Sequence, residues 1–336
     1  MIKPNKENSK HQFLGTQKTP SNTHLNHHAT LSLSTNSFKS SSPLQVDSHS
    51  YLKSLSIHLD YLRVSTTNLN KRDLDNLLNS LFSKVDYKII NKPWYPDSKM
   101  PKSKKYQNRI SSKIGIVLGY TKRAKFKGRN TRHVYDIMID FTGAYFVHLG
   151  LVEQLKLIYY LNSNWKLKCH RIDIAIDDYS RDIFPVCQMI SAYLDDNQYG
   201  FKVINDDYLD IINNKFVGTL GLGSRHSSFF VRIYTLHEFF VRWETELKQT
   251  KAQNLFDYLA DSSQDKLDSS LFIKTTQEAL VNAAIGKIDF RDNSKYTNLR
   301  HASRSKTDRL YFWQLFIDEV SGKINNQADI KHLKDG

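Results

Sequence analysis

The chain has 336 residues, 40% of them hydrophobic, which is enough for a substantial core in one large domain or two modest ones. Lys and Arg outnumber Asp and Glu by 48 to 34, and the resulting net charge of +14 favours nucleic acid as the partner. Two cysteines exclude a disulfide framework and a thiolate zinc site within one chain. The sequence also lacks a secretory signal and a membrane span of roughly 18 apolar residues, so we expect a soluble cytoplasmic protein without a membrane partner.

The first elements are a polar tail, a strand and a helix. Residues 1–50 are rich in Ser, Thr, Asn and His and predict a disordered polar tail. Order is expected to begin near Leu55, where Leu55, Ile57 and Leu59 alternate with polar residues as in a strand. Apolar residues then recur at helical spacing over residues 74–82, which predicts a helix.

A long basic stretch follows. Between Asp97 and His133 the chain holds twelve Lys and Arg and no acid, with aromatic residues in it and near its borders. This mixture is typical of contacts to the DNA backbone combined with stacking on bases, and a solvated basic loop is the alternative. The candidate DNA-binding cations are Lys104, Lys105, Arg109, Lys122, Arg123, Lys125, Lys127 and Arg129.

Further strands and single helices predict an α+β protein. Residues 114–120 and 136–141 are expected to form strands joined by a hairpin through residues 127–129, and residues 144–149 a third strand. Helices are expected over residues 151–161 and 184–194. We therefore divide the chain into the tail (1–50), a larger domain (51–250) and a smaller, mostly helical C-terminal region (251–336).

The run Arg171–Asp178 alternates three isoleucines with an arginine and two acids. Because strand side chains alternate between faces, the isoleucines point to a core while Asp173 and Asp177 share the opposite face with Arg171. In a basic protein this acidic face suggests a divalent metal site. An ordinary exposed acidic face is the alternative.

Two more segments carry polar faces. Residues 218–234 predict a strand, the turn Gly223-Ser224-Arg225-His226-Ser227, and a second strand on which Arg232 and Tyr234 share a face. The turn offers N–H groups, hydroxyls and a guanidinium for a phosphate, and a plain hairpin turn is the alternative. A third strand, residues 241–248, again gathers ionic side chains on one face.

Together these strands resemble the plasmid rolling-circle replication initiators of the trans-acting Rep family, which are related to relaxases of conjugative elements. The shared patterns are Arg-x-Asp-x-Ala-x-Asp at 171–177, Gly-Ser-Arg-x-Ser at 223–227 with Arg-x-Tyr at 232–234, and Arg-x-Glu at 242–244. The resemblance covers about residues 55–320 and departs at Leu236, where the family usually has lysine. It implies a relaxase-like α+β fold in which helices flank a central, mainly antiparallel sheet. It also implies that residues 51–250 are the catalytic nicking domain and makes residues 251–336 a candidate for origin recognition.

The resemblance also implies site-specific nicking of plasmid DNA at the double-strand origin by a tyrosine that becomes joined to the new 5′ phosphate. Tyr234 is the candidate nucleophile, and Arg232 and Arg225 are candidates for neutralising charge on the phosphate. A phenol with a pKa of about 10 is a poor nucleophile at neutral pH, so it needs help with deprotonation.

A metal ion is the expected cofactor. Mg²⁺ or Mn²⁺ held by Asp173, Asp177 and Glu244 would polarise the phosphate. Ser224 and Ser227 are candidates for DNA contact in the turn.

Some roles and functions stay open. Asp178 can bind metal or cap the following turn, and the sequence assigns no role to Glu246 or His226. The expected partners are origin DNA, a host helicase and a second copy in a homodimer. Two alternatives to the initiator are a non-catalytic plasmid DNA-binding regulator and a metal-dependent nuclease that uses water.

Overall fold

The structure is a computed structural model, and the described residues all belong to the unit that spans residues 41–336. They are 55–83, 85–90, 94, 106–127, 130–201, 204–212, 215–236, 240–262, 270–286, 288–293 and 307–334. The predicted polar tail, residues 1–50, lies outside them.

Along the chain, runs of one to five described strands are separated by one or two helices. The strands are β1 (Leu55–Leu69), β2 (Tyr87–Ile90), β3 (Asn108–Ser112), β4 (Ile116–Lys127), β5 (Asn130–Phe141), β6 (Lys168–Asp178), β7 (Gln198–Tyr199), β8 (Ile204–Ile212), β9 (Lys215–Leu222), β10 (Phe229–Leu236), β11 (Phe240–Lys248) and β12 (Asp289–Phe290). The helices are α1 (Lys71–Phe82), α2 (Gly143–Phe146), α3 (Leu151–Trp165), α4 (Val186–Leu194), α5 (Thr250–Ser262), α6 (Ser270–Ile285) and α8 (Tyr311–Lys334).

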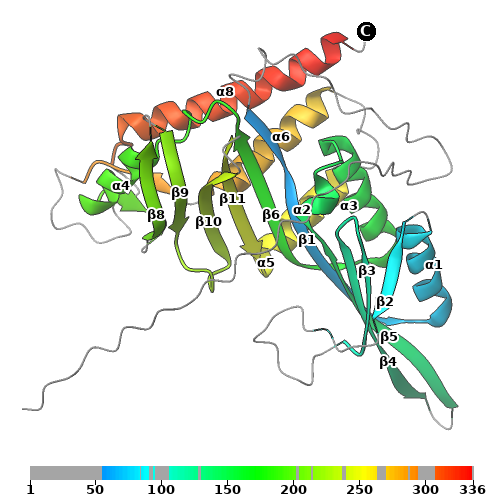
Figure 1. The fold of residues 1–336 in the computed structure, drawn as a ribbon. Coiled ribbons are helices and arrows are strands. Elements are labelled where there is room, and N and C mark those ends of the chain that lie inside the picture. Colours follow the sequence, from blue (N-terminus) through cyan, green and yellow to red (C-terminus); the bar gives the residue numbers. More distant parts are fainter. Residues whose placement is uncertain are drawn as a thin grey trace, which may run out of the picture. The chain divides into compact units, whose positions relative to one another are not determined.

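Ten of the described strands form one sheet in the order β2-β3-β4-β5-β1-β6-β11-β10-β9-β8 (Figure 1). Every neighbouring pair in it is antiparallel. The order departs from chain order at the centre, because β1 pairs with β5 on one side and β6 on the other, and β11 pairs with β6. The predicted α+β fold with a central antiparallel sheet is confirmed.

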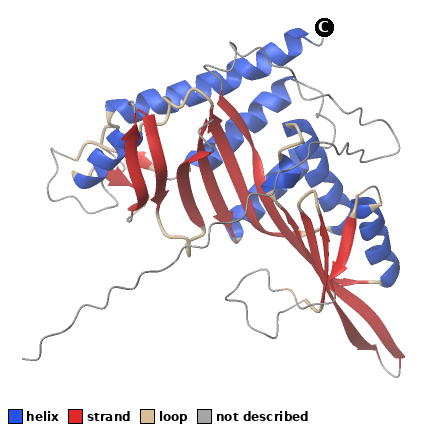
Figure 2. Cartoon of the chain, in the orientation of Figure 1, coloured by secondary structure: helices blue, strands red, loops and turns tan. Residues whose placement is uncertain are grey.

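One face of this sheet is apolar and carries the helices. Ile172, Ile174 and Ile176 of β6 are fully buried, and α3, α5, α6 and α8 pack against β1, β6 or β11. Figure 2 shows these helices on one side of the sheet, while the side toward the viewer has no helix over its central strands. The polar residues of β6, β10 and β11 alternate with the apolar ones and therefore project from this second face.

Aromatic residues join the C-terminal helix to the sheet. Trp313 of α8 is fully buried, with its ring centroid 6.2 Å from that of Trp243 in β11 and 4.9 Å from those of Phe290 and Phe316. Such rings bury large apolar areas, so α8 belongs to the same core as the central strands. No helix in the described part of the chain is long and apolar enough to cross a membrane.

Most predicted elements are present, and one is wrong. The hairpin of β4 and β5 extends further than expected, and the chain from α5 onward is mainly helical. The strand predicted over residues 144–149 is instead α2 followed by a turn. Tyr145 and Phe146 read as strand formers, but both are buried with ring centroids 5.2 and 6.4 Å from Phe141, so tertiary packing overrides the local preference. The domain boundary near residue 250 stays a prediction.

Candidate active site

The register of three neighbouring strands brings the polar sequence patterns together. Asp177 of β6 lies opposite Arg242 of β11, which lies opposite Tyr234 of β10. Glu244, two residues further along β11, lies opposite Arg232 of β10. Since side chains two residues apart share a face, all five groups project from the polar side of the sheet.

Tyr234 is hydrogen-bonded to a carboxylate. Its Oη donates to Glu244 Oε2 at 2.7 Å, and Arg232 Nη2 donates to the other oxygen, Oε1. Burial and the neighbouring Glu244 carboxylate raise the pKa of Tyr234 well above its usual value. The phenol is therefore protonated at neutral pH and has a proton acceptor in direct contact.

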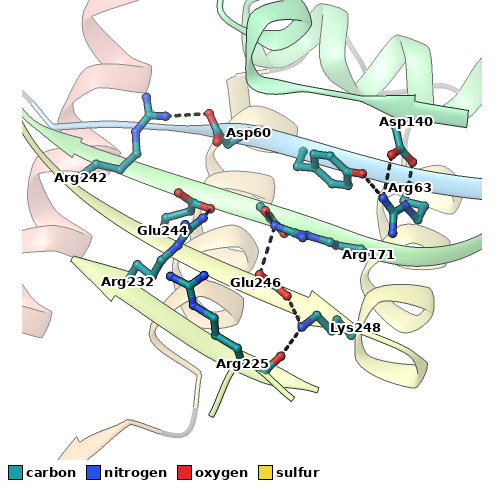
Figure 3. A network of polar contacts seen from close by, with 12 residues as sticks. Asp60, Arg63, Asp140, Arg171, Arg225, Arg232, Arg242, Glu244, Glu246 and Lys248 are labelled. Atoms are coloured by element: carbon teal, nitrogen blue, oxygen red, sulfur yellow. Dashed lines mark hydrogen bonds and ion pairs between the residues drawn. The ribbon is translucent and has the colours of Figure 1, made fainter. Parts of the chain in front are cut away.

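Arg242 joins two carboxylates on the same face. It donates from Nε to Asp177 Oδ1 at 2.6 Å. It also donates from Nη1 to Asp60 Oδ1 at 2.7 Å (Figure 3). His58 Nε2 lies 3.9 Å from Asp177 Oδ2. Burial raises the pKa of Asp60, although Arg242 acts to lower it. Burial also lowers the pKa of His58, so its imidazole is neutral at pH 7.

His58 and Asp60 are site residues that the sequence motifs missed. A register shift in β1 between Leu59 and Tyr61 leaves Asp60 as an extra residue against β6, as in a β-bulge. Its carboxylate reaches Arg242, which comes from another strand. The alternation that predicts β1 already places both residues on the polar face. This alternation is the sequence signal that could have identified them as site residues.

A second ionic group lies further along the same face. Arg171 Nε donates to Asp173 Oδ1 at 2.8 Å, and Arg171 Nη2 lies 3.1 Å from Glu246 Oε2. Glu246 also forms an ion pair with Lys248 (Figure 3). Burial raises the pKa of Asp173 to about 7, although Arg171 acts to lower it. Glu246 therefore belongs to this group rather than to the contacts of Tyr234.

The predicted metal ligands are buried but not gathered around one point. Asp173, Asp177 and Glu244 are 1%, 2% and 3% exposed, so the alternative of an ordinary exposed acidic face is wrong. Asp173 and Asp177 are four residues apart in β6, or about 13 Å, whereas two oxygens on one cation lie at most about 5 Å apart. Each carboxylate contacts an arginine instead.

Among the described residues, no group of three or more His, Cys, Asp or Glu has an arrangement that can hold a metal ion. The predicted trio therefore does not fit a single metal ion in this arrangement.

Asp178 caps the turn that follows β6. Its Oδ1 accepts from the N–H groups of Ser180 at 2.9 Å and Arg181 at 3.0 Å, and its Oδ2 accepts from the N–H of Ile183 at 2.8 Å. These three bonds occupy both carboxylate oxygens. The sequence left metal binding and capping open as roles for Asp178, and the structure shows capping.

The turn between β9 and β10 uses its own hydroxyls. Ser224 Oγ accepts from the N–H of His226 at 3.2 Å, and Ser227 Oγ bonds to the backbone of Phe229. The guanidinium carbon of Arg225 lies 5.6 Å from the centroid of the Phe230 ring. Figure 3 shows the Arg225 side chain extending along the polar face toward Arg232.

The predicted DNA-binding cations that the structure describes lie away from Tyr234. Lys122, Arg123 and Lys125 are exposed on β4, and Arg109 is half-buried on β3. Lys104, Lys105, Arg129 and the side chain of Lys127 lie outside the described residues. Five strand spacings, about 24 Å, separate β4 from β10. The basic stretch and the tyrosine therefore belong to different parts of one sheet.

Comparison with known proteins gives a match at the level of fold. No family model and no curated protein matches the chain. Among solved structures, a rolling circle replication initiator protein from Geobacillus stearothermophilus is similar, with a TM-score of 0.53 and 17% identity over 80% of this chain and 97% of that chain. The resemblance to rolling-circle initiators inferred from the sequence patterns is thus confirmed for the fold.

Proposed function

We propose that the chain initiates rolling-circle replication of a plasmid by binding the double-strand origin and nicking one strand with Tyr234. The observation that carries this proposal is the 2.7 Å hydrogen bond from Tyr234 Oη to Glu244, between two arginines on the polar face of the sheet. The fold shared with a rolling circle replication initiator supports the same role.

In the proposed reaction, Glu244 accepts the phenolic proton as Tyr234 Oη attacks the phosphorus. The new bond joins the phosphorus to Oη. The bond to the 3′ oxygen breaks, and its electron pair stays on that oxygen, which takes a proton from water. The phosphotyrosine keeps a phosphodiester bond, so the reverse reaction can rejoin the strands.

Arg232 and Arg242 would stabilise the charge on the phosphate. Arg242 lies directly opposite Tyr234 in the ladder, and Arg232 lies two residues before it on the same face. Both guanidinium groups are already bound to carboxylates, so an entering phosphate must share or displace these ion pairs. Donors aimed at a developing charge are worth most where they are held in place before the reaction.

A requirement for Mg²⁺ or Mn²⁺ stays a prediction. Because the predicted trio does not fit one ion, we derive no step through a metal. The nuclease that uses water and the non-catalytic regulator differ from the initiator in their products, so one experiment separates all three.

The test uses the purified chain and a supercoiled plasmid that carries its origin, with Mg²⁺ or Mn²⁺, followed by denaturant. We expect nicked DNA with protein attached to its 5′ end, and Tyr234→Phe abolishes the attachment. Glu244→Gln slows it about 10²- to 10⁴-fold, the range for loss of a general base. Tyr160→Phe changes an exposed tyrosine on α3 and serves as the control.

Free nicked DNA without attached protein would favour the water-using nuclease. Intact DNA with the unaltered chain would favour the regulator.

A further inference from the structure

The strands β4 and β5 continue beyond the rest of the sheet as a two-stranded ribbon. Neighbour pairing on β4 ends at Tyr120, opposite Asn108 of β3, and pairing on β5 ends at Tyr135, opposite Leu69 of β1. Within the described residues, 121–127 of β4 therefore pair only with 130–136 of β5, in unbroken register, and residues 130–134 have no second strand partner. Figure 1 shows this ribbon projecting past the neighbouring strands. Its seven residues on β4 extend about 23 Å.

The ribbon holds two cations directly opposite each other. Lys125 pairs across the ladder with Arg132, and both are exposed. Like charges opposite each other destabilise a sheet. The neighbouring Arg123 is bound to Asp136, and no acid occurs in the sequence between Asp97 and Asp136. An anionic partner would relieve the repulsion between Lys125 and Arg132.

The other face of the ribbon carries a large apolar side chain. Phe126 is 76% exposed and pairs across the ladder with Thr131, next to exposed Lys122 and Ala124. An isolated two-stranded hairpin is only marginally stable in water. Because Phe126 is mostly exposed, packing within the ribbon does not explain the presence of this large apolar side chain.

We propose that the ribbon enters the major groove of duplex DNA. A two-stranded ribbon fits this groove, which is about 12 Å wide. With the Phe126 face toward the floor of the groove, Phe126 would contact the apolar edges of bases such as the thymine methyl group. The long side chains of Lys125 and Arg132, on the outer face, would reach the phosphates along the rims of the groove. The proposal rests on the proposed function for its substrate, the duplex of the origin, and assigns the ribbon to DNA binding and not to strand cleavage.

The ribbon and the tyrosine share the polar face of the sheet. Lys125 and Arg132 lie on the same face of β4 and β5 as Asp140, which binds Arg63 of β1 on the polar face.

Across the strands, five spacings of about 24 Å in total separate β4 from β10. Along the strands, Tyr234 lies in the row of Ser56 of β1. Arg132 lies three residues beyond Tyr135, the partner of Leu69 in β1, which adds about 50 Å along the strands. The ribbon would therefore contact the duplex well away from the bond that Tyr234 cuts.

The test measures binding of the full-length chain to a fluorescent duplex of mixed sequence, by anisotropy over a range of NaCl concentrations. Lys125→Ala should lower the slope of log affinity against log salt by about 0.9, the value for one lost phosphate contact. Lys156→Ala removes an equally exposed lysine from α3 and should leave the slope unchanged. Phe126→Ala should weaken binding without changing the slope.

The variant Arg132→Glu distinguishes a loss of DNA binding from a loss of protein stability. It replaces two facing cations with an opposite-charge pair, so the thermal unfolding midpoint should not fall, while DNA affinity should fall about tenfold. Attachment of Tyr234 to a single-stranded oligonucleotide of the origin should be unchanged in all the ribbon variants.

The proposal is overturned if Lys125→Ala and Arg132→Glu bind duplex as the unaltered chain does, or if Lys156→Ala weakens binding equally. Failure of the nicking function would be seen separately, as an unaltered chain that attaches to no DNA while the ribbon variants still lose duplex affinity.

Discussion

At the scale of single residues, the polar face is held together by arginines. Asp173, Asp177 and Glu244 are buried under guanidinium groups and not under a helix. A buried carboxylate is costly unless it is paired and hydrogen-bonded, and here every one is. Removing one partner leaves an unpaired charge, so variants of these residues must be compared for folding as well as for nicking.

Asp173→Asn should become more stable relative to the unaltered chain as the pH rises. Burial raises the pKa of Asp173 to about 7, so between about pH 4 and pH 7 the folded form holds a proton that the unfolded form has lost. This group therefore destabilises the fold progressively over that window, and the effect levels off above it. The asparagine variant lacks the effect. Thermal unfolding midpoints of both proteins across this pH range measure it.

Asp75→Asn is the matched control, because Asp75 lies at the surface of α1 in an ion pair with Lys71. A constant difference between Asp173→Asn and the unaltered chain at every pH would contradict the expectation.

The sequence contains enough to place most of the site but not all of it. Alternation alone puts Asp173 with Asp177, and Arg232 with Tyr234, on shared faces. The four-residue spacing in a strand already separates Asp173 from Asp177 by about 13 Å, too far to bind one ion. What the sequence does not show is which arginines pair with these carboxylates, because that depends on the neighbouring strands. Nor does it reveal that Asp60 reaches Arg242, since a bulge and a pairing between distant strands have no local signature.

At the scale of elements, α8 is part of the core and not an appendage. Its Trp313 packs among Trp243, Phe290 and Phe316, which come from β11, β12 and α8 itself. A helical C-terminal region is readable from periodicity, but its docking against β11 depends on contacts between distant segments. The misassigned strand at residues 144–149 has the same origin, because aromatic residues there fill space against β5.

Trp313→Ala should lower the free energy of unfolding by about 3–5 kcal/mol, the usual cost of removing a fully buried large aromatic side chain. Leu315→Ala, on the same helix but 47% exposed, should cost less than about 1 kcal/mol. Urea denaturation of both variants measures the difference. Equal losses would mean that α8 does not form part of the cooperative core.

At the scale of the whole molecule, the ionic groups around Tyr234 and the basic ribbon lie in separate regions of one sheet. The ionic contacts of Tyr234 come from β1, β6, β10 and β11, whereas the basic ribbon extends from β4 and β5. A net charge of +14 alone predicts nucleic acid but not which surface meets it. The strand order in the sheet supplies that information. This order cannot be predicted from the sequence, because β1 lies between β5 and β6 and β11 lies between β6 and β10.

Deleting residues 1–50 should leave the rate of covalent attachment to DNA unchanged, because the site residues all lie between His58 and Lys248. Single-turnover attachment by the full chain and by residues 51–336 compares them directly. A deleted chain that is insoluble or unfolded would show that the fold depends on the tail.

The position of β11 has a consequence for protein synthesis. Tyr234 is made before Glu244 and Arg242, and the strand that carries those two residues inserts between β6 and β10. A polypeptide released early, with β10 but without β11, has the tyrosine but neither its proton acceptor nor the arginine opposite it. Under the proposed function, truncated translation products would therefore be unable to cut DNA, and only chains synthesised past β11 would expose the plasmid to nicking.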